Sequence, residues 1–124
     1  MTIDRLFLFT GALLGFTAVA AGAFGGHLLK TRLIPEMLAV YEVGVRYHLI
    51  HAVALLACAW AAVQYPHPLT RSAGWLFLAG TILFSGSLYA LALTGIKGLG
   101  AVTPVGGLLL LAGWLCLAVG ALRA

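Results

Sequence analysis

Long apolar stretches alternate with short polar ones along the whole chain. A stretch of about 20 apolar residues can cross the hydrocarbon core of a bilayer as one α-helix. Four stretches reach this length, at about residues 3–25, 47–63, 72–93 and 104–122. The pattern therefore predicts an all-α integral membrane protein, a four-helix bundle in which residues 1–124 form one transmembrane domain.

Residues 35–46, just before the second span, have an amphipathic pattern. Pro35 suits the first turn of a helix, and Glu36 favours the positive helix N-terminus. Glu42 and Arg46 are four residues apart and can pair on a helix surface. This segment is predicted to be either a lead-in that continues into the second helix or a short separate helix lying on the membrane.

Small residues form a stripe on the first and the last spans. The first stripe is Gly11, Gly15, Ala18, Gly22 and Gly25, and the last is Gly106, Gly113 and Gly120. Such stripes let membrane helices approach closely, so the first and last helices are predicted to pack together. Gly25-Gly26 is predicted to end the first helix, and Thr103 to cap the last one ahead of Pro104.

Composition supports the membrane assignment. The chain is 63% hydrophobic and 8% charged, with a mean hydropathy of +1.10, whereas a soluble domain carries roughly 25% charged residues. These values exclude a soluble globule and a disordered chain. The net charge of +4 comes from residues at or between span ends, which indicates headgroup anchoring. No clustered basic face suggests nucleic-acid binding.

Topology follows in part from the number of spans. Four spans place both termini on the same side of the membrane, but the basic residues are divided too evenly to choose which side. Cys58 and Cys116 lie inside spans and form no metal-binding pattern, so they are expected to be ordinary buried thiols.

Four segments, taken together and in order, carry a family resemblance. They are GAFGGH at residues 22–27, RYHLIHA at 46–52, LFSGSLY at 83–89 and TPVGG at 103–107. The chain resembles the YgdD/YwdK-like family of small bacterial membrane proteins, which has small eukaryotic transmembrane relatives. The resemblance implies a four-helix protein of the bacterial inner membrane and implies no activity. His27 and His51 match the family pattern, whereas a neutral residue often replaces His48, so no family-wide role is implied for His48.

Three histidines near the first connection are the main candidates for chemistry: His27, His48 and His51. They would lie near one membrane surface if the connection folds back. One interpretation is hydrogen bonding at the interface to backbone, headgroups or neighbouring hydroxyls. A second is ligation of haem or a metal by imidazole pairs. A third is a proton relay or a quinone contact.

Thr81, Ser85 and Tyr89 form a polar stripe on the third span, because they recur every fourth residue. The stripe either lines a small ligand site or bonds the backbone of a neighbouring helix. No nucleophile motif and no H-E-x-x-H pattern occurs, so no catalytic residues, no metal site and no cofactor are expected.

Two functional hypotheses follow. The leading one is a non-enzymatic scaffold or accessory subunit that forms a homo-oligomer or joins a larger membrane complex, because small-residue stripes are dense. It predicts that Gly15→Leu or Gly113→Leu disrupts assembly. The alternative is a protein that handles a small molecule, a proton, haem or a quinone, and it predicts that His51→Ala abolishes binding without unfolding. The candidate binding residues are His27, His51, Ser85 and Tyr89.

Overall fold

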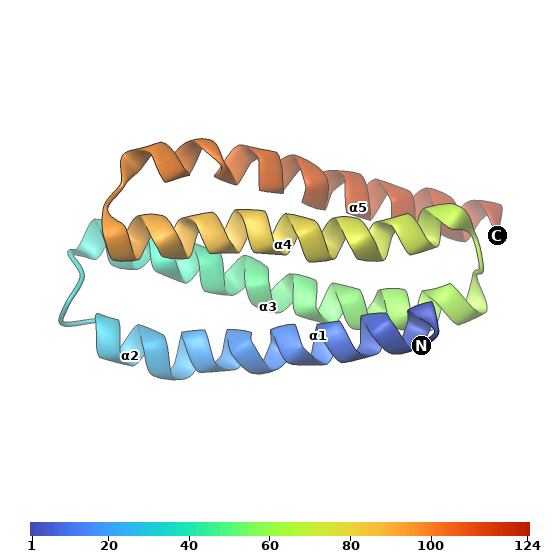
Figure 1. The fold of residues 1–124 in the computed structure, drawn as a ribbon, viewed down its shortest axis with the longest axis horizontal. Coiled ribbons are helices and arrows are strands. Elements are labelled where there is room, and N and C mark those ends of the chain that lie inside the picture. The colour runs from blue at the N-terminus through green and yellow to red at the C-terminus, as the bar shows by residue number, and fades with distance from the viewer.

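The computed structural model describes all 124 residues, and it contains helices but no strands. The helices are α1 (Ile3–Val19), the π-helix η1 (Ala20–Gly25), α2 (Gly26–Leu29), α3 (Pro35–Gln64), α4 (Pro68–Thr94), the 3-10 helix η2 (Lys97–Ala101) and α5 (Thr103–Arg123). They form 4 segments that are long and apolar enough to cross a membrane. The predicted all-α, four-span architecture is confirmed, and both termini lie at the same end of the molecule (Figure 1).

The four long segments do not form a closed square. Helices α3 and α4 pack together in the centre, α1 packs against α3, and α5 packs against α4. Helices α1 and α5 therefore lie at opposite edges of the bundle (Figure 1). The prediction that the first and last helices pack together is wrong, because each one packs along its chain neighbour instead.

The small-residue stripes are used inside the chain. A Cβ added at Gly11 would lie 2.9 Å from the Leu56 side chain of α3, and one at Gly113 would lie 2.8 Å from the Phe77 ring of α4. The space that these glycines leave is therefore filled by the neighbouring helix. Gly15 differs, because nothing lies within 4 Å of a Cβ at that position.

The first membrane segment continues past Gly25-Gly26, so the prediction that these glycines end it is wrong. Both keep helical backbone angles, and a π-helical turn leads into α2. A π-turn breaks the regular carbonyl ladder. Here the Tyr41 hydroxyl donates a 2.6 Å hydrogen bond to the Ala21 carbonyl, which compensates for that break.

The amphipathic lead-in is continuous with the second span. Helix α3 has 30 residues, or about 45 Å, which exceeds the roughly 30 Å hydrocarbon core of a bilayer. The alternative of a separate surface helix is wrong. Thr103 does not cap α5, because its hydroxyl shares a 2.6 Å hydrogen bond with Ser87 of α4. It therefore helps to join α4 to α5.

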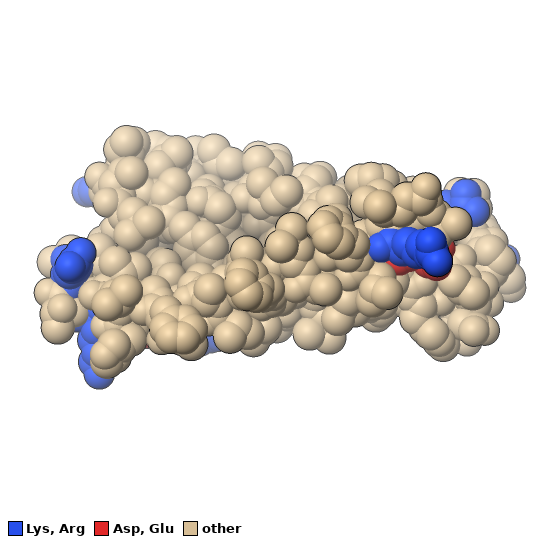
Figure 2. Space-filling view, turned by 60° about the horizontal axis from the view of Figure 1, so that its bottom comes forward, with Lys and Arg blue, Asp and Glu red and all other residues tan.

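The surface has the character expected in a bilayer. Figure 2 shows charged side chains gathered toward the two ends, with a broad uncharged surface between them. Large hydrophobic side chains such as Phe16, Ile82 and Leu115 are exposed there. This surface faces lipid.

Candidate functional site

The structure does not bring the four predicted candidate residues together. His27 is exposed on the short helix α2 at one end of the bundle. His51 is buried between α3 and α5. Ser85 and Tyr89 lie on α4, near His48 rather than near His27 or His51. The three histidines therefore belong to three different environments.

His51 is a fully hydrogen-bonded core residue. Its Nδ1 lies 2.7 Å from the Tyr47 carbonyl, and its Nε2 lies 3.1 Å from Trp114 Nε1. A carbonyl can only accept and an indole N–H can only donate, so this geometry requires a neutral imidazole with its proton on Nδ1. Both ring nitrogens are occupied, which leaves neither free for a haem iron. His51 instead connects α3 to α5.

His48 connects three helices. Its Nδ1 lies 2.9 Å from the Tyr89 hydroxyl of α4, and its Nε2 lies 3.1 Å from the Thr17 hydroxyl of α1. The Thr17 hydroxyl donates its only proton to the backbone of α1, so it accepts from Nε2–H of His48, and the Tyr89 hydroxyl donates to Nδ1. The arrangement is a hydroxyl–imidazole–hydroxyl chain across α1, α3 and α4.

A cleft of about 230 Å³ lies beside these hydrogen-bonded side chains, between α1 and α4, and His48 of α3 forms part of its wall. We call it the midplane cleft, and its polar lining is Thr17, His48, Thr81, Ser85 and Tyr89. Ser85 donates a 2.7 Å hydrogen bond to the Gly44 carbonyl. The Thr81 hydroxyl is buried and has no hydrogen-bond partner in the protein.

The depth of this cleft follows from the position of its residues along the helices. Thr17 follows the first residue of α1 by 14 positions, and His48 and Thr81 follow the first residues of α3 and α4 by 13. These offsets correspond to about 20 Å, near the middle of helices about 40 to 45 Å long. Thr17, His48 and Thr81 therefore lie near the midplane of the bilayer, where unpaired polar groups are costly, whereas Ser85 and Tyr89 extend the polar lining toward the end of α4.

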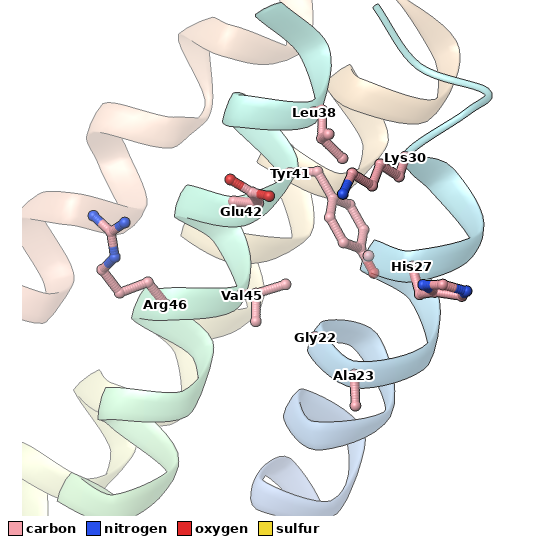
Figure 3. Close-up of a pocket in the computed structure, with 10 residues that line it drawn as sticks. Gly22, Ala23, His27, Lys30, Leu38, Tyr41, Glu42, Val45 and Arg46 are labelled. Carbon is pink, nitrogen blue, oxygen red and sulfur yellow. The ribbon is translucent and has the colours of Figure 1, made fainter. Parts of the chain in front are cut away.

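A second cavity, of about 520 Å³, lies at one end of the bundle between η1–α2 and α3. We call it the end groove, and its polar lining residues are His27, Lys30, Tyr41, Glu42 and Arg46. Lys30 extends over Tyr41 on the side of Glu42, whereas His27 and Arg46 project outward on opposite sides (Figure 3). Glu42 and Arg46 also point to different sides of α3, contrary to the pairing expected from their spacing (Figure 3).

Sequence reasoning missed part of the midplane cleft. The spacing of Thr81, Ser85 and Tyr89 indicated a common face, and all three line the cleft. The family resemblance implies no role for His48, and no pattern in the sequence indicates Thr17. The signal that could have identified His48 and Thr17 is their position, because both are polar residues near the middle of long apolar helices.

Comparison with known proteins gives a consistent family assignment. A family model described as "Protein of unknown function (DUF423)" matches residues 21–107. The UPF0382 membrane protein YwdK of Bacillus subtilis is 40% identical over 120 residues, covering 96% of this chain and 98% of the relative. The UPF0382 inner membrane protein YgdD of Escherichia coli K12 is 42% identical over 121 residues, covering 97% and 92%.

A UPF0382 membrane protein of Staphylococcus haemolyticus is 42% identical over 116 residues, covering 93% of each chain. No solved structure matches the chain. The sequence relatives confirm the resemblance and the location in the membrane, including the inner membrane of the Escherichia coli protein. The chain therefore belongs to the DUF423, or UPF0382, family of integral membrane proteins.

Proposed function

We propose that this protein is a non-enzymatic membrane protein that binds a small uncharged molecule in the midplane cleft. The molecule carries a carbonyl group, and quinones belong to this class. The observation that carries the proposal is the Thr81 hydroxyl, which is buried among the lining residues and has no partner. The hydroxyl is fully covered in this structure, so a carbonyl oxygen on a bound molecule would accept its proton after the Thr81 side chain turns toward the cleft.

The absence of a partner distinguishes Thr81 from other threonines of this chain. Thr10, Thr17 and Thr94 each donate to the backbone carbonyl four residues earlier in their helix. This internal bond is the usual solution for a threonine in an apolar helix. Thr70, which is also without a partner, lies in the first turn of α4, where no preceding helical turn exists. Thr81 lies in the middle of α4, so helix position does not explain its free hydroxyl.

The lining of the cleft supports an uncharged occupant. No carboxylate, lysine, arginine or cysteine lines it, and His48 already shares both ring nitrogens with hydroxyl groups. These features also favour binding over catalysis, since Ser85 donates its proton to the Gly44 carbonyl and both ring nitrogens of His48 are hydrogen-bonded within the protein. A water molecule takes about 30 Å³ of liquid volume. A cleft of about 230 Å³ therefore suits a ring-sized group.

The test uses Thr81→Val, which keeps the shape of the side chain and removes the hydroxyl. Thr94→Val is the matched control, because Thr94 is exposed on the same helix and bonds its own backbone. Thermal unfolding in mild detergent is measured with and without a short-tailed benzoquinone as the probe. A ligand at about 100 times its Kd stabilises a protein by about 2.7 kcal/mol. We expect stabilisation of the wild type and of Thr94→Val but not of Thr81→Val.

A second expectation concerns the stability of Thr81→Val in the absence of the benzoquinone. Removing a buried hydroxyl that has no partner removes a cost of about 1–3 kcal/mol. Thr81→Val is therefore expected to be at least as stable as the wild type when the cleft is empty. A wild type that gains no stability from the benzoquinone, or a Thr81→Val protein that gains as much, contradicts the proposal.

We also propose that the protein assembles with itself or with a larger membrane complex through the exposed side of α1. Gly15 supports this, because it is the glycine of the first stripe at which an added Cβ would meet no atom within 4 Å. Gly15→Leu is expected to leave the bundle folded and to shift native mass spectra toward single chains. Gly113→Leu is the contrasting variant and is expected to disturb the fold itself, since Phe77 occupies that space. An unchanged distribution of assemblies in Gly15→Leu contradicts this second proposal.

A further inference from the structure

We propose that two copies of this chain dimerise through the exposed face of α3, joined by two ion pairs between Glu42 of one copy and Arg46 of the other. Three features support this contact: the depth of the two charges in the membrane, the sides of α3 to which they project, and the exposed stripe that continues from them. The contact lies on α3, so it rests neither on the midplane cleft nor on the α1 contact proposed at Gly15.

Glu42 and Arg46 both lie at the depth of the hydrocarbon core. They follow the first residue of α3 by 7 and 11 positions, or about 10 and 17 Å. A helix about 45 Å long that is centred on the roughly 30 Å core extends beyond it by about 7 Å at each end. Both side chains are exposed on the surface of the single chain. Exposed charges at this depth are costly unless they meet an opposite charge.

The chain itself leaves Arg46 without an acid. Glu42 projects to a different side of α3, toward Lys30 at the end of α2 (Figure 3). The other acidic residues are Asp4 and Glu36. Asp4 lies at the opposite end of the bundle (Figure 1), and Glu36 lies in the first turn of α3, about 15 Å from Arg46 along the helix. An acid for Arg46 must therefore come from outside the chain.

The divergence of Glu42 and Arg46 fits a two-fold dimer. A copy related by a two-fold axis along the membrane normal presents the same face of α3, parallel and rotated by half a turn. The side that carries Arg46 then faces the side of the other copy that carries Glu42, so two equivalent ion pairs form. The two residues differ in depth by about 6 Å, and the long arginine side chain extends toward the headgroups to meet the carboxylate.

The chemistry of the two groups favours a second copy over a lipid headgroup. A carboxylate has acceptor sites for a lysine and an arginine together, so the approach of Lys30 to Glu42 leaves room for Arg46 of the other copy. The planar fork of an arginine matches the two oxygens of a carboxylate. A lipid phosphate would pair with Arg46 and repel Glu42, whereas a second copy pairs both charges.

An exposed apolar stripe continues from these charges along the same face of α3. Its members follow Arg46 at alternating spacings of three and four residues, the pattern with which two parallel helices pack side by side. They are Leu49, Val53, Leu56, Trp60 and Val63, with exposed fractions between 36% and 60%. In a bilayer such a stripe adds van der Waals packing but no hydrophobic driving force. The ion pairs therefore decide which faces meet, and the stripe extends the contact.

Oxidative crosslinking of the full chain in membranes tests whether α3 meets α3. Val53→Cys places a thiol in the middle of the stripe and is expected to form a disulfide-linked dimer. Leu115→Cys is the matched control, because Leu115 is as exposed as Val53, at 68% against 60%, but lies on α5. It is expected to give no dimer. The unsubstituted chain, which contains Cys58 and Cys116, shows what the native thiols contribute.

Charge reversal then tests the ion pairs, with Arg46→Glu and Glu42→Arg each placed in the Val53→Cys chain. Either substitution sets like charges against each other in a dimer, so each is expected to lower dimer affinity at least about tenfold. Expressed together, one chain carries two acids and the other two bases at these positions, and crosslinking is expected to return. Lys97→Glu reverses a charge on η2 at the same end of the bundle and is expected to change nothing.

The return of crosslinking is specific to a pair between copies, and it also shows that both reversed chains fold. If Arg46 pairs with lipid headgroups, the reversed chains still crosslink singly. If it pairs with another membrane protein or with Glu42 of its own chain, joint expression restores nothing. Either result overturns the proposal, as does a Val53→Cys chain that forms no more dimer than Leu115→Cys. These outcomes leave the proposals for the midplane cleft and for Gly15 standing, because the benzoquinone probe and Gly15→Leu test those separately.

Discussion

Gly106→Ala is expected to destabilise the protein by about 1–3 kcal/mol, the usual cost of overpacking a close contact. Alanine has a higher helix propensity than glycine, which by itself would stabilise the protein. The sign of the change in stability is therefore decided by the contact with the neighbouring helix. A Cβ at Gly106 would lie 2.8 Å from the Cα of Phe84, and nearer still to its backbone nitrogen. Backbone atoms of α4 cannot rotate away, so α5 must move outward and lose its contact along the glycine stripe.

Gly107→Ala is the matched control, one residue along the same helix. The nearest atoms to a Cβ there are carbons of the Phe84 ring at 3.7 Å, an ordinary van der Waals distance. This variant is expected to be as stable as the wild type or slightly more stable, because helix propensity then decides. The two free energies of unfolding are measured in mixed micelles of mild and denaturing detergent. Equal effects of the two substitutions would show that α4 and α5 do not pack through Gly106.

His51→Ala is expected to lower the free energy of unfolding by roughly 2–4 kcal/mol. The substitution leaves a cavity beside Phe77, and it leaves the partly buried indole N–H of Trp114 without its acceptor. It also removes the donor to the Tyr47 carbonyl. This expectation reverses the one from sequence, in which His51→Ala removes binding and keeps the bundle intact.

His27→Ala is the control for this prediction. His27 is exposed on α2, so the same substitution is expected to change the free energy of unfolding by less than about 0.5 kcal/mol. Both variants are compared with the wild type by detergent unfolding, and tryptophan fluorescence reports on the surroundings of Trp114. A His51→Ala protein as stable as the wild type would contradict the structural role of this histidine.

The sequence predicted the fold because hydrophobic length is a strong signal in a membrane protein. The number of spans was correct, and most of their ends differ by a few residues, but the second helix begins at Pro35 instead of near residue 47 because the amphipathic lead-in is part of it. Helix α4, for example, begins at Pro68, where His67 Nδ1 accepts a 3.2 Å hydrogen bond from the Leu69 amide. The continuation of the first helix through Gly25-Gly26 was not predictable, because it depends on the contact between Tyr41 and Ala21.

Helix pairing and site composition were harder to predict, because both depend on tertiary contacts. A small-residue stripe shows that a helix approaches something closely, but it does not identify the partner. The stripes of α1 and α5 suggested that these two helices meet, whereas each packs against its chain neighbour. Similarly, the three histidines predicted to lie near one membrane surface have separate environments, since His27 is exposed and His48 and His51 bond to different helices. Their hydrogen bonds depend on tertiary contacts that spacing alone does not specify.

Native mass spectrometry of the protein, extracted gently with its own lipids, tests the central claim most directly. The account predicts that each wild-type chain carries one small uncharged molecule, lighter than a phospholipid, and that Thr81→Val has lost it while Thr94→Val retains it. Dissociation and identification of this molecule would show whether it carries the expected carbonyl group. A wild-type chain that carries no such molecule, or a molecule that Thr81→Val retains in full, would contradict the account.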